Sequence, residues 1–135
     1  MPYGSVGSAT IEESGVFTPR FDAAGLIPCI TMDDATGDVL MLAWMNPEAL
    51  SKTLETGQVH YWSRSRQALW KKGETSGALQ SVVELRTDCD QDTILARVRV
   101  TARANTCHTG RATCFYRSIP LGNGPLERPF ASRED

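Results

Sequence analysis

The chain has 135 residues, of which 41% are hydrophobic and 22% are charged, and its formal net charge is −2 at pH 7. This length and composition are typical of a single globular domain. The small negative charge excludes a general attraction to nucleic acids, and no apolar run approaches the roughly 20 residues that span a bilayer. The N-terminus lacks the features of a secretory signal, so we expect a cytoplasmic protein with neither nucleic-acid nor membrane partners.

The chain is predicted to form one domain between two irregular ends. Residues 1–20 are rich in Gly, Ser and Thr and are predicted to form a flexible N-terminal arm. A single domain is predicted over residues 21–119. Residues 120–135 are rich in Pro and Gly and are predicted to form a C-terminal tail.

The domain is predicted to be α+β, with a mainly antiparallel sheet and one principal helix. The helix lies in "NPEALSKTLETG", where Asn46 is suited to the N-cap, Pro47 to the first turn and Gly57 to the C-terminal end. Strands are predicted at residues 26–32, 39–45, 58–62, 80–87 and 93–102, and the turn "DDATGD" joins the first two as a hairpin. Apolar residues alternate along the last strand, which indicates a sheet with one buried face.

The stretch "RTDCDQDTIL" places Asp88, Asp90 and Asp92 around Cys89. If the backbone is extended, the three carboxylates share one side and the thiol points to the other. A calcium-binding EF-hand loop is excluded, because Thr93 stands where that loop needs Gly. A divalent cation site of another kind remains, and the alternative is a solvated acidic turn.

Two further cysteines, Cys107 and Cys114, lie in "CHTGRATC", where a turn would bring both sulfur atoms together. With His108 and the distant Cys89 they supply enough soft ligands for zinc, although buried structural cysteines are the alternative. Cys29, in an apolar strand, is predicted to be a core residue.

The zinc site is predicted to lie between two subunits. If residues 89–101 are extended, they cover about 40 Å, and residues 101–107 can return at most about 20 Å. Either a sharp bend intervenes, or Cys89 of one subunit joins Cys107 and Cys114 of another. We favour the second arrangement, which makes the protein an obligate homodimer with its sites at the interface.

A third cluster of residues lies in "HYWSRSRQALWKKGETSG", where aromatic and basic residues are interleaved. Its Gly, Ser and Thr residues suit a phosphorylated ligand, although the Trp residues are equally suited to a core. The predicted ligand-binding residues are Arg64, Trp70, Lys72, Gly73, Thr75 and Ser76. His60 is predicted to be a surface strand residue rather than a ligand.

The sequence resembles the phosphoribosyl-AMP cyclohydrolase family of histidine biosynthesis. The blocks that carry the resemblance are "GLIPCI", "MLAWMN", "YWSRSR", "WKKGETSG", "DCDQD" and "CHTGRATCFYR". The resemblance implies a homodimeric α+β hydrolase that opens the adenine ring of 1-(5-phosphoribosyl)-AMP at the N1–C6 bond.

The resemblance also implies the metals and their ligands. One zinc per subunit would be bound by Cys89 with Cys107 and Cys114 of the partner chain, and magnesium by Asp88, Asp90 and Asp92. Zinc would activate water for addition at C6. His108 is our candidate for the general base or acid, since its ordinary pKa is near ~6.5. Magnesium, with Lys72, Thr75 and Ser76, would hold substrate phosphate.

Two other functions are alternatives to a cyclohydrolase. A zinc nucleobase deaminase shares this chemistry, but its H-x-E and P-C-x-x-C signature is absent from the sequence. A zinc-stabilised binding module would explain the cysteines and the Trp/Arg stretch without catalysis. Removal of the metal separates these possibilities, because a module unfolds on chelation.

Overall fold

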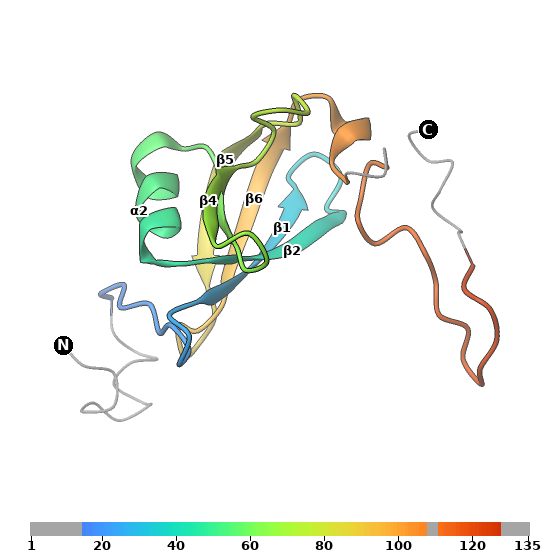
Figure 1. Ribbon diagram of the computed structural model, residues 1–135, viewed down its shortest axis with the longest axis horizontal. Coiled ribbons are helices and arrows are strands. Elements are labelled where there is room, and N and C mark those ends of the chain that lie inside the picture. The colour runs from blue at the N-terminus through green and yellow to red at the C-terminus, as the bar shows by residue number, and fades with distance from the viewer. Residues whose placement is uncertain (1–14, 108–110, 128–135) are drawn as a thin grey trace.

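The computed structural model describes residues 15–107 and 111–127. These residues form one α-helix, a short 3₁₀ helix and six strands (Figure 1). In chain order the elements are β1 (Ile27–Asp33), β2 (Val39–Met45), α2 (Pro47–Thr56), β3 (His60–Ser63), β4 (Ala68–Lys71), β5 (Gln80–Thr87), β6 (Ile94–Val100) and the 3₁₀ helix η2 (Arg103–Asn105). Within the described ranges, no helix has the length and apolar character needed to cross a membrane.

The principal helix, α2, lies where the sequence predicts it. The Asn46 side chain accepts a hydrogen bond from the Ala49 N–H at 2.8 Å, and Pro47 opens the first turn. Gly57 ends the helix with a φ of 72°, a left-handed conformation that costs glycine little, and its N–H donates to the Thr53 carbonyl. These capping contacts confirm the predicted helix at both ends.

The sheet has the strand order β4-β3-β2-β1-β6-β5. The β1–β2, β2–β3, β3–β4 and β5–β6 pairs are antiparallel, but β1 and β6 are parallel. The sheet is therefore mixed, although antiparallel pairs predominate as predicted. Strand β4 was not predicted, because its short stretch lies within the aromatic and basic segment and does not alternate in polarity.

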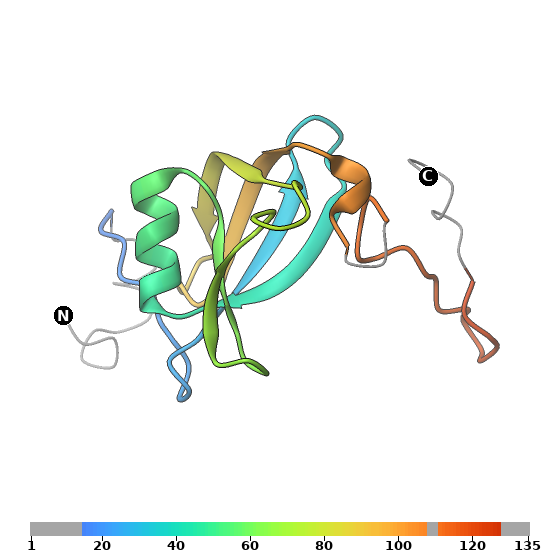
Figure 2. The same ribbon diagram turned by 45° about the horizontal axis from the view of Figure 1, so that its top comes forward.

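The sheet curls until its ends approach each other, with α2 alongside (Figure 2). The chain just before β3 meets the beginning of β5, where Gln58 and Ser81 form an isolated antiparallel bridge. The Val59 N–H donates to the Gln80 carbonyl at 3.0 Å, and the Val82 N–H donates to the Gly57 carbonyl at 2.8 Å. The β4–β5 connection lies close to the end of β6, where the Thr101 N–H donates to the Leu79 carbonyl at 3.1 Å.

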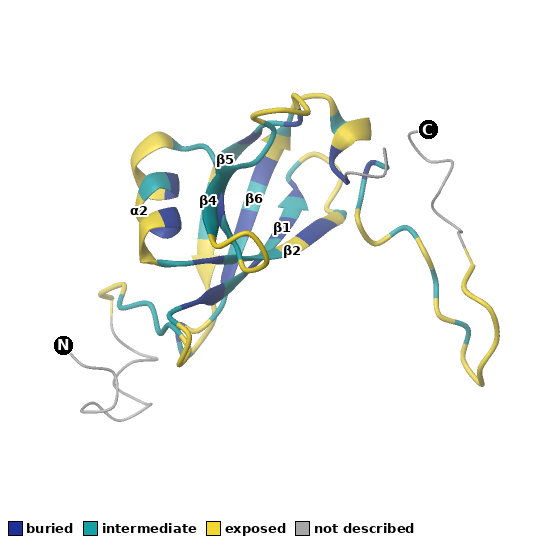
Figure 3. Cartoon of the chain, in the orientation of Figure 1, coloured by how far each residue is buried: buried dark blue, intermediate teal, exposed yellow. Residues whose placement is uncertain are grey.

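The core lies inside this curled sheet. On β6, Ile94, Ala96 and Val98 are buried, which confirms the predicted alternation (Figure 3). Cys29 is fully buried in β1, as predicted. The prediction for His60 is wrong, because its side chain is buried and its Nδ1 lies 2.8 Å from the Gln58 carbonyl oxygen. The His60 N–H also donates to the Thr53 Oγ1 of α2 at 2.9 Å, and no local pattern signals this burial.

The segment from residue 111 to residue 127 contacts β2 through Thr113 and Cys114, then leaves the body of the molecule and is largely exposed (Figures 1 and 3). A bridge between Ser118 and Glu127 folds its outer part back on itself. Ile119 and Leu121 are almost entirely exposed to solvent, at 78% and 101% of their reference surface. This segment therefore presents apolar side chains away from the core.

Candidate functional site

The acidic cluster lies in the tight turn between β5 and β6. One carboxylate oxygen from each of Asp88, Asp90 and Asp92 lies within 4.8 Å of the others. The backbone is not extended here, so the alternating-face prediction is wrong. The Asp88 Oδ1 accepts hydrogen bonds from the N–H groups of Asp92, at 3.0 Å, and Thr93, at 3.2 Å, which close the turn. The three carboxylates converge because the turn is closed, and not because of strand alternation.

Electrostatic crowding in this turn favours a hard cation. The pKa of Asp92 is raised, first by its hydrogen bond with Asp88 and then by desolvation and by the other two carboxylates. For Asp88, desolvation acts to raise the pKa, but hydrogen bonds from Asp92, Thr93 and Asp90 outweigh it and lower the pKa overall. Oxygen ligands and clustered negative charge suit magnesium, so the residues fit that ion.

Hydrogen bonds between Gln91 and the N-terminal segment hold the acidic turn in place. Gln91 is buried and has a φ of 61°, and its Oε1 accepts a hydrogen bond from the Thr18 N–H at 2.7 Å. Its Nε2 donates to the Val16 carbonyl at 3.2 Å, and its own carbonyl accepts from the Arg20 N–H at 2.7 Å. The sequence alone does not predict this role, because a single Gln among acidic residues carries no local signal. The predicted arm boundary at residue 20 stays a prediction.

The thiol pair, Cys107 and Cys114, lies near the opposite end of β6. Their side chains are hydrogen-bonded to each other, and Cys107 is buried. The Cys107 N–H donates to the Arg111 carbonyl at 2.9 Å, and the Cys114 N–H donates to the Leu40 carbonyl of β2 at 2.7 Å. The structure thus brings together the two cysteines that the C-x6-C spacing pairs.

The surroundings of the thiol pair raise the pKa of Cys114 to about 12. Removal of its sulfur from water is the main cause, and the charge and hydrogen bond of Cys107 add to it, whereas Lys72 acts in the opposite direction. All four cysteines lie in the described part of the chain, and none forms a disulfide. Two adjacent reduced sulfur atoms are a donor set that fits zinc.

Cys89 does not join the thiol pair within one chain. It lies in the acidic turn before β6, whereas Cys107 follows η2 beyond the far end of that strand (Figure 1). A strand of this length covers about 20 Å at ~3.3 Å per residue. The described residues of a single chain therefore offer two adjacent sulfur ligands for zinc, and the third predicted sulfur lies elsewhere.

Lys72 connects the thiol pair to the β3–β4 hairpin. Its Nζ donates a hydrogen bond to the Thr106 carbonyl and lies 5.8 Å from the centre of the Trp70 ring. Desolvation lowers the pKa of Lys72, and the charges of Cys114 and Cys107 partly oppose that shift. The ammonium group is thus close to both sulfur atoms, a placement that the sequence did not predict.

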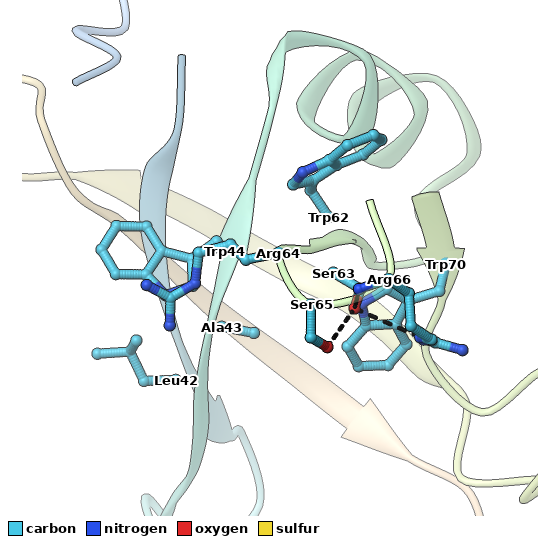
Figure 4. Close-up of a pocket in the computed structure, with 9 residues that line it drawn as sticks. All are labelled: Leu42, Ala43, Trp44, Trp62, Ser63, Arg64, Ser65, Arg66 and Trp70. Carbon is cyan, nitrogen blue, oxygen red and sulfur yellow. Dashed lines mark hydrogen bonds between the residues drawn. The ribbon is translucent and has the colours of Figure 1, made fainter. Parts of the chain in front are cut away.

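A cavity of about 620 Å³ lies over the β2–β3–β4 surface (Figure 4). Its walls combine three Trp side chains with two Arg side chains, and the Arg64 guanidinium lies 4.8 Å from the Trp44 ring centre. The Arg66 Nε donates to the Ser63 Oγ at 3.3 Å. The lining residues are Leu42, Ala43, Trp44, Trp62, Ser63, Arg64, Ser65, Arg66 and Trp70. Aromatic faces beside guanidinium groups suit a base and a phosphate.

A second cavity, of about 190 Å³, adjoins the first and shares Arg66 and Trp70 with it. The two cavities together contain every predicted ligand-binding residue. The second is lined by Arg66, Trp70, Lys71, Lys72, Gly73, Glu74, Thr75 and Ser76. Lys72 lines this cavity and its Nζ also reaches the Thr106 carbonyl next to Cys107, so this side chain connects the cavity to the thiol pair.

Gly73 has a conformational role in this second cavity. Its φ is 86°, and a Cβ at this position would lie only 2.3 Å from the backbone of Ala78 and Leu79. The loop can therefore fold back against β5 only with glycine here. Thr75 and Ser76 are exposed beside it. His108, the predicted proton-transfer residue, lies outside the described residues.

Comparisons with known proteins agree with the resemblance seen in the sequence. A family model described as "Phosphoribosyl-AMP cyclohydrolase" matches residues 41–116. A protein of that name from Brucella abortus (strain S19) is 58% identical over 125 residues, which cover 93% of this chain and 90% of the relative. Another from Brucella anthropi is 62% identical over 116 residues, covering 86% and 82%. A third, from Chelativorans sp. (strain BNC1), is 58% identical over 120 residues, covering 89% and 86%.

Proposed function

The chain belongs to the phosphoribosyl-AMP cyclohydrolase family, and from this premise we propose that it hydrolyses 1-(5-phosphoribosyl)-AMP in histidine biosynthesis. The observation that carries the proposal is the position of the thiol pair beside a cationic and aromatic cavity. Lys72 and Trp70 join these two features. Since both substrate and product are phosphorylated nucleotides, we expect the enzyme to act in the cytoplasm.

Zinc would be held by Cys107 and Cys114 of one subunit together with the partner subunit's Cys89. Two observations support this sharing: Cys89 lies at the other end of β6, and the nearby segment 111–127 exposes Ile119 and Leu121. Exposed apolar side chains of this kind are typical of an interaction surface. The enzyme would then be an obligate homodimer with one zinc per subunit. When bound, zinc lowers the pKa of a water ligand, which supplies a nucleophile at neutral pH.

The acidic turn would hold magnesium through Asp88, Asp90 and Asp92. If the subunits share the zinc site, the turn of one subunit lies beside the thiol pair of the other. Magnesium would then supply positive charge for substrate phosphate close to the reacting ring. The clustering of three carboxylate oxygens within 4.8 Å supports this assignment.

The two joined cavities would bind the substrate. Phosphoribosyl-AMP has a phosphate at each end and a purine between them, and the joined cavities offer polar groups at both ends with Trp70 where they meet. Arg64 and Arg66 suit one phosphate, and Thr75 and Ser76 suit the other. The Trp rings provide flat surfaces on which the purine can stack.

The reaction adds one water molecule across the N1–C6 bond. The water oxygen bonds to C6, the N1–C6 bond breaks, and N1 takes up a proton, so that C6 becomes the carbon of a carboxamide. A residue must therefore remove a proton from water and return one to N1. We assign this role to His108, because it follows Cys107 directly in the sequence.

An assay on purified protein tests the proposed function. Incubation with phosphoribosyl-AMP should change the ultraviolet absorbance as the purine opens, and AMP should be unreactive because its N1 is not alkylated. Ring opening releases no ammonia, whereas a deaminase would release one ammonia per turnover. Ammonia release, or no reaction with zinc-loaded protein, would refute the proposal. Chelation should abolish activity and leave the circular dichroism spectrum unchanged, whereas unfolding would indicate a zinc-stabilised module.

A further inference from the structure

Lys72 lies at the end of β4, near the place where the chain before β3 meets the beginning of β5. It follows the last residue of β4, and its backbone N–H donates to the Val59 carbonyl at 3.1 Å. Its side chain is partly buried, and its Nζ donates a hydrogen bond to the Thr106 carbonyl. An ammonium group removed from water needs a hydrogen-bond acceptor, and the Thr106 carbonyl supplies one here.

The acceptor of this hydrogen bond belongs to the peptide group that leads directly into Cys107. Thr106 is fully buried, and its Oγ1 donates to the Arg103 carbonyl at 2.8 Å. Arg103 in turn forms ion pairs with Asp33 at the end of β1, at 2.9 Å, and with Asp38 in the β1–β2 connection, at 2.7 Å. The backbone around Cys107 is therefore held from the β1–β2 connection and from Lys72.

The charge of Lys72 also acts on the thiol pair directly, because the ammonium interacts electrostatically with both Cys107 and Cys114. A zinc ion bound by three thiolates has a net charge of −1. One ammonium group beside the site would bring the local charge to zero. When a residue that orients the ligands of a metal or balances their charge is replaced, the affinity for the metal commonly falls by about 10- to 100-fold.

We propose that Lys72 is a positioning residue of the metal site, which holds the Thr106–Cys107 peptide group and offsets the negative charge of the thiolate ligands. This inference rests on the zinc site of the proposed function. It replaces phosphate binding as the main role of Lys72, because the side chain is already directed to Thr106 and the thiols. Arg64 and Arg66, which are exposed, remain for substrate phosphate.

Zinc affinity, measured by competition with a chromogenic chelator, tests this role without reference to activity. Lys72→Met should raise the zinc dissociation constant by about 10- to 100-fold. In zinc-saturated enzyme, its KM for phosphoribosyl-AMP should rise by less than about tenfold, because Lys72 lines the second cavity but its Nζ is directed to the Thr106 carbonyl. Lys71→Met is the matched control, since Lys71 is the adjacent lysine on β4, and it should bind zinc like wild type.

Two further variants separate the effect of the hydrogen bond to the Thr106 carbonyl from the effect of the positive charge. Lys72→Gln keeps a donor for the Thr106 carbonyl without the charge, and Lys72→Arg keeps the charge with a different shape. Both should bind zinc less tightly than wild type and more tightly than Lys72→Met. If Lys72→Met does not fold, as judged by circular dichroism, these two variants are compared with wild type instead.

Wild-type zinc affinity in the Met and Gln variants, together with a tenfold or larger rise in KM, would overturn the inference and make Lys72 a substrate contact. Wild-type protein that binds no zinc would overturn it as well. Protein that binds zinc in a Lys72-dependent manner but does not open phosphoribosyl-AMP would refute the proposed function and support this inference. The two failures are therefore distinguishable.

Discussion

The two ends of β6 carry groups of opposite chemical character and are built in different ways. At the β5–β6 turn, carboxylates gather through short-range contacts, since the Asp88 side chain accepts hydrogen bonds from residues only four and five positions later. At the other end, Cys107 and Cys114 are placed by β2, by the β1–β2 connection and by Lys72. The carboxylates of the oxygen cluster converge through local hydrogen bonds, whereas the sulfur pair depends on several distant elements.

This difference has a consequence for a shared site. A turn that is closed by its own hydrogen bonds can be presented to a second subunit without rearrangement. The thiol pair is instead fixed against the body of its own chain. A site that joins Cys89 of one subunit to the thiol pair of another would therefore combine a turn closed by its own hydrogen bonds with a thiol pair that is fixed against its own chain.

The largest expected effect tests whether the two ends of β6 meet between subunits. Cys89→Ser and Cys107→Ser proteins should each be inactive, because every site in either homodimer lacks one ligand. When equal amounts are unfolded and refolded together, half the dimers are mixed, and each mixed dimer regains one complete site. Activity and bound zinc should recover to roughly one quarter of the wild-type level, as two-fold symmetry requires.

The same experiment contains its own control. Refolding each mutant alone should restore dimers, measured by light scattering, but no activity. A mixture that forms dimers and stays inactive and poor in zinc would show that all three cysteines act within one chain. The chain would then have to bend so that the acidic turn reaches the thiol pair.

A second prediction concerns the thiol end alone. His108→Ala should lower turnover by ~10²- to 10⁴-fold, the usual loss when a general acid or base is removed. Zinc content and the dimer should be unchanged, since the predicted sulfur ligands remain. Turnover near the wild-type value would remove His108 from the mechanism, and parallel loss of zinc would identify it as a ligand.

A third prediction concerns the acidic end alone. Asp90→Asn removes one charged ligand, so the magnesium concentration needed for half-maximal activity should rise by at least the ~10- to 100-fold seen when an outer partner of a metal ligand is lost. Zinc content should stay at the wild-type level, because Asp90→Asn keeps Cys89 and the thiol pair, which are the predicted sulfur ligands. Loss of zinc in step with magnesium would mean that the two clusters form a single site.

The sequence predicted those parts of the molecule that short-range rules determine. Capping by Asn46 and Gly57 defined α2, and alternation defined β6. The acidic cluster was found from spacing, although an extended backbone was the wrong reason. Its real basis is side-chain hydrogen bonding within a turn, which is common for Asp and recognisable from composition.

The features that the sequence did not predict depend on contacts between distant segments. The parallel pairing of β1 with β6 has no local signal, and neither does the buried position of His60, whose backbone is hydrogen-bonded to Thr53 of α2. Lys72 was interpreted as a phosphate ligand because its neighbours in the chain are Gly, Thr and Ser. Its contact with Thr106 crosses 34 residues and becomes visible only once the sheet has curled.

The smallest expected effect uses Cys29, a thiol that belongs to neither end of β6. Burial raises its pKa from the usual value of 9.0 to about 12, and its hydrogen bond with Thr31 opposes this only in part. Below pH 9 the thiol is protonated in both folded and unfolded protein, so its contribution to stability is constant. Between about pH 9 and pH 12 the unfolded chain loses the proton and the folded chain keeps it, so folding becomes less favourable as pH rises.

Ionisation of Cys29 in the unfolded chain alone should reduce the free energy of unfolding by about 1.4 kcal/mol per pH unit between about pH 9 and pH 12. Tyr61 also has a raised pKa and adds to the decline, so the informative quantity is the difference between wild type and Cys29→Ala. Urea unfolding at one protein concentration from pH 8 to pH 11 should show parallel behaviour below pH 9 and a steeper decline for wild type above it. Parallel curves over the whole range would show that Cys29 ionises equally in both states. A steeper wild-type decline would show that a raised thiol pKa can arise from burial alone, which makes Cys29 the reference for Cys114 at the proposed metal site.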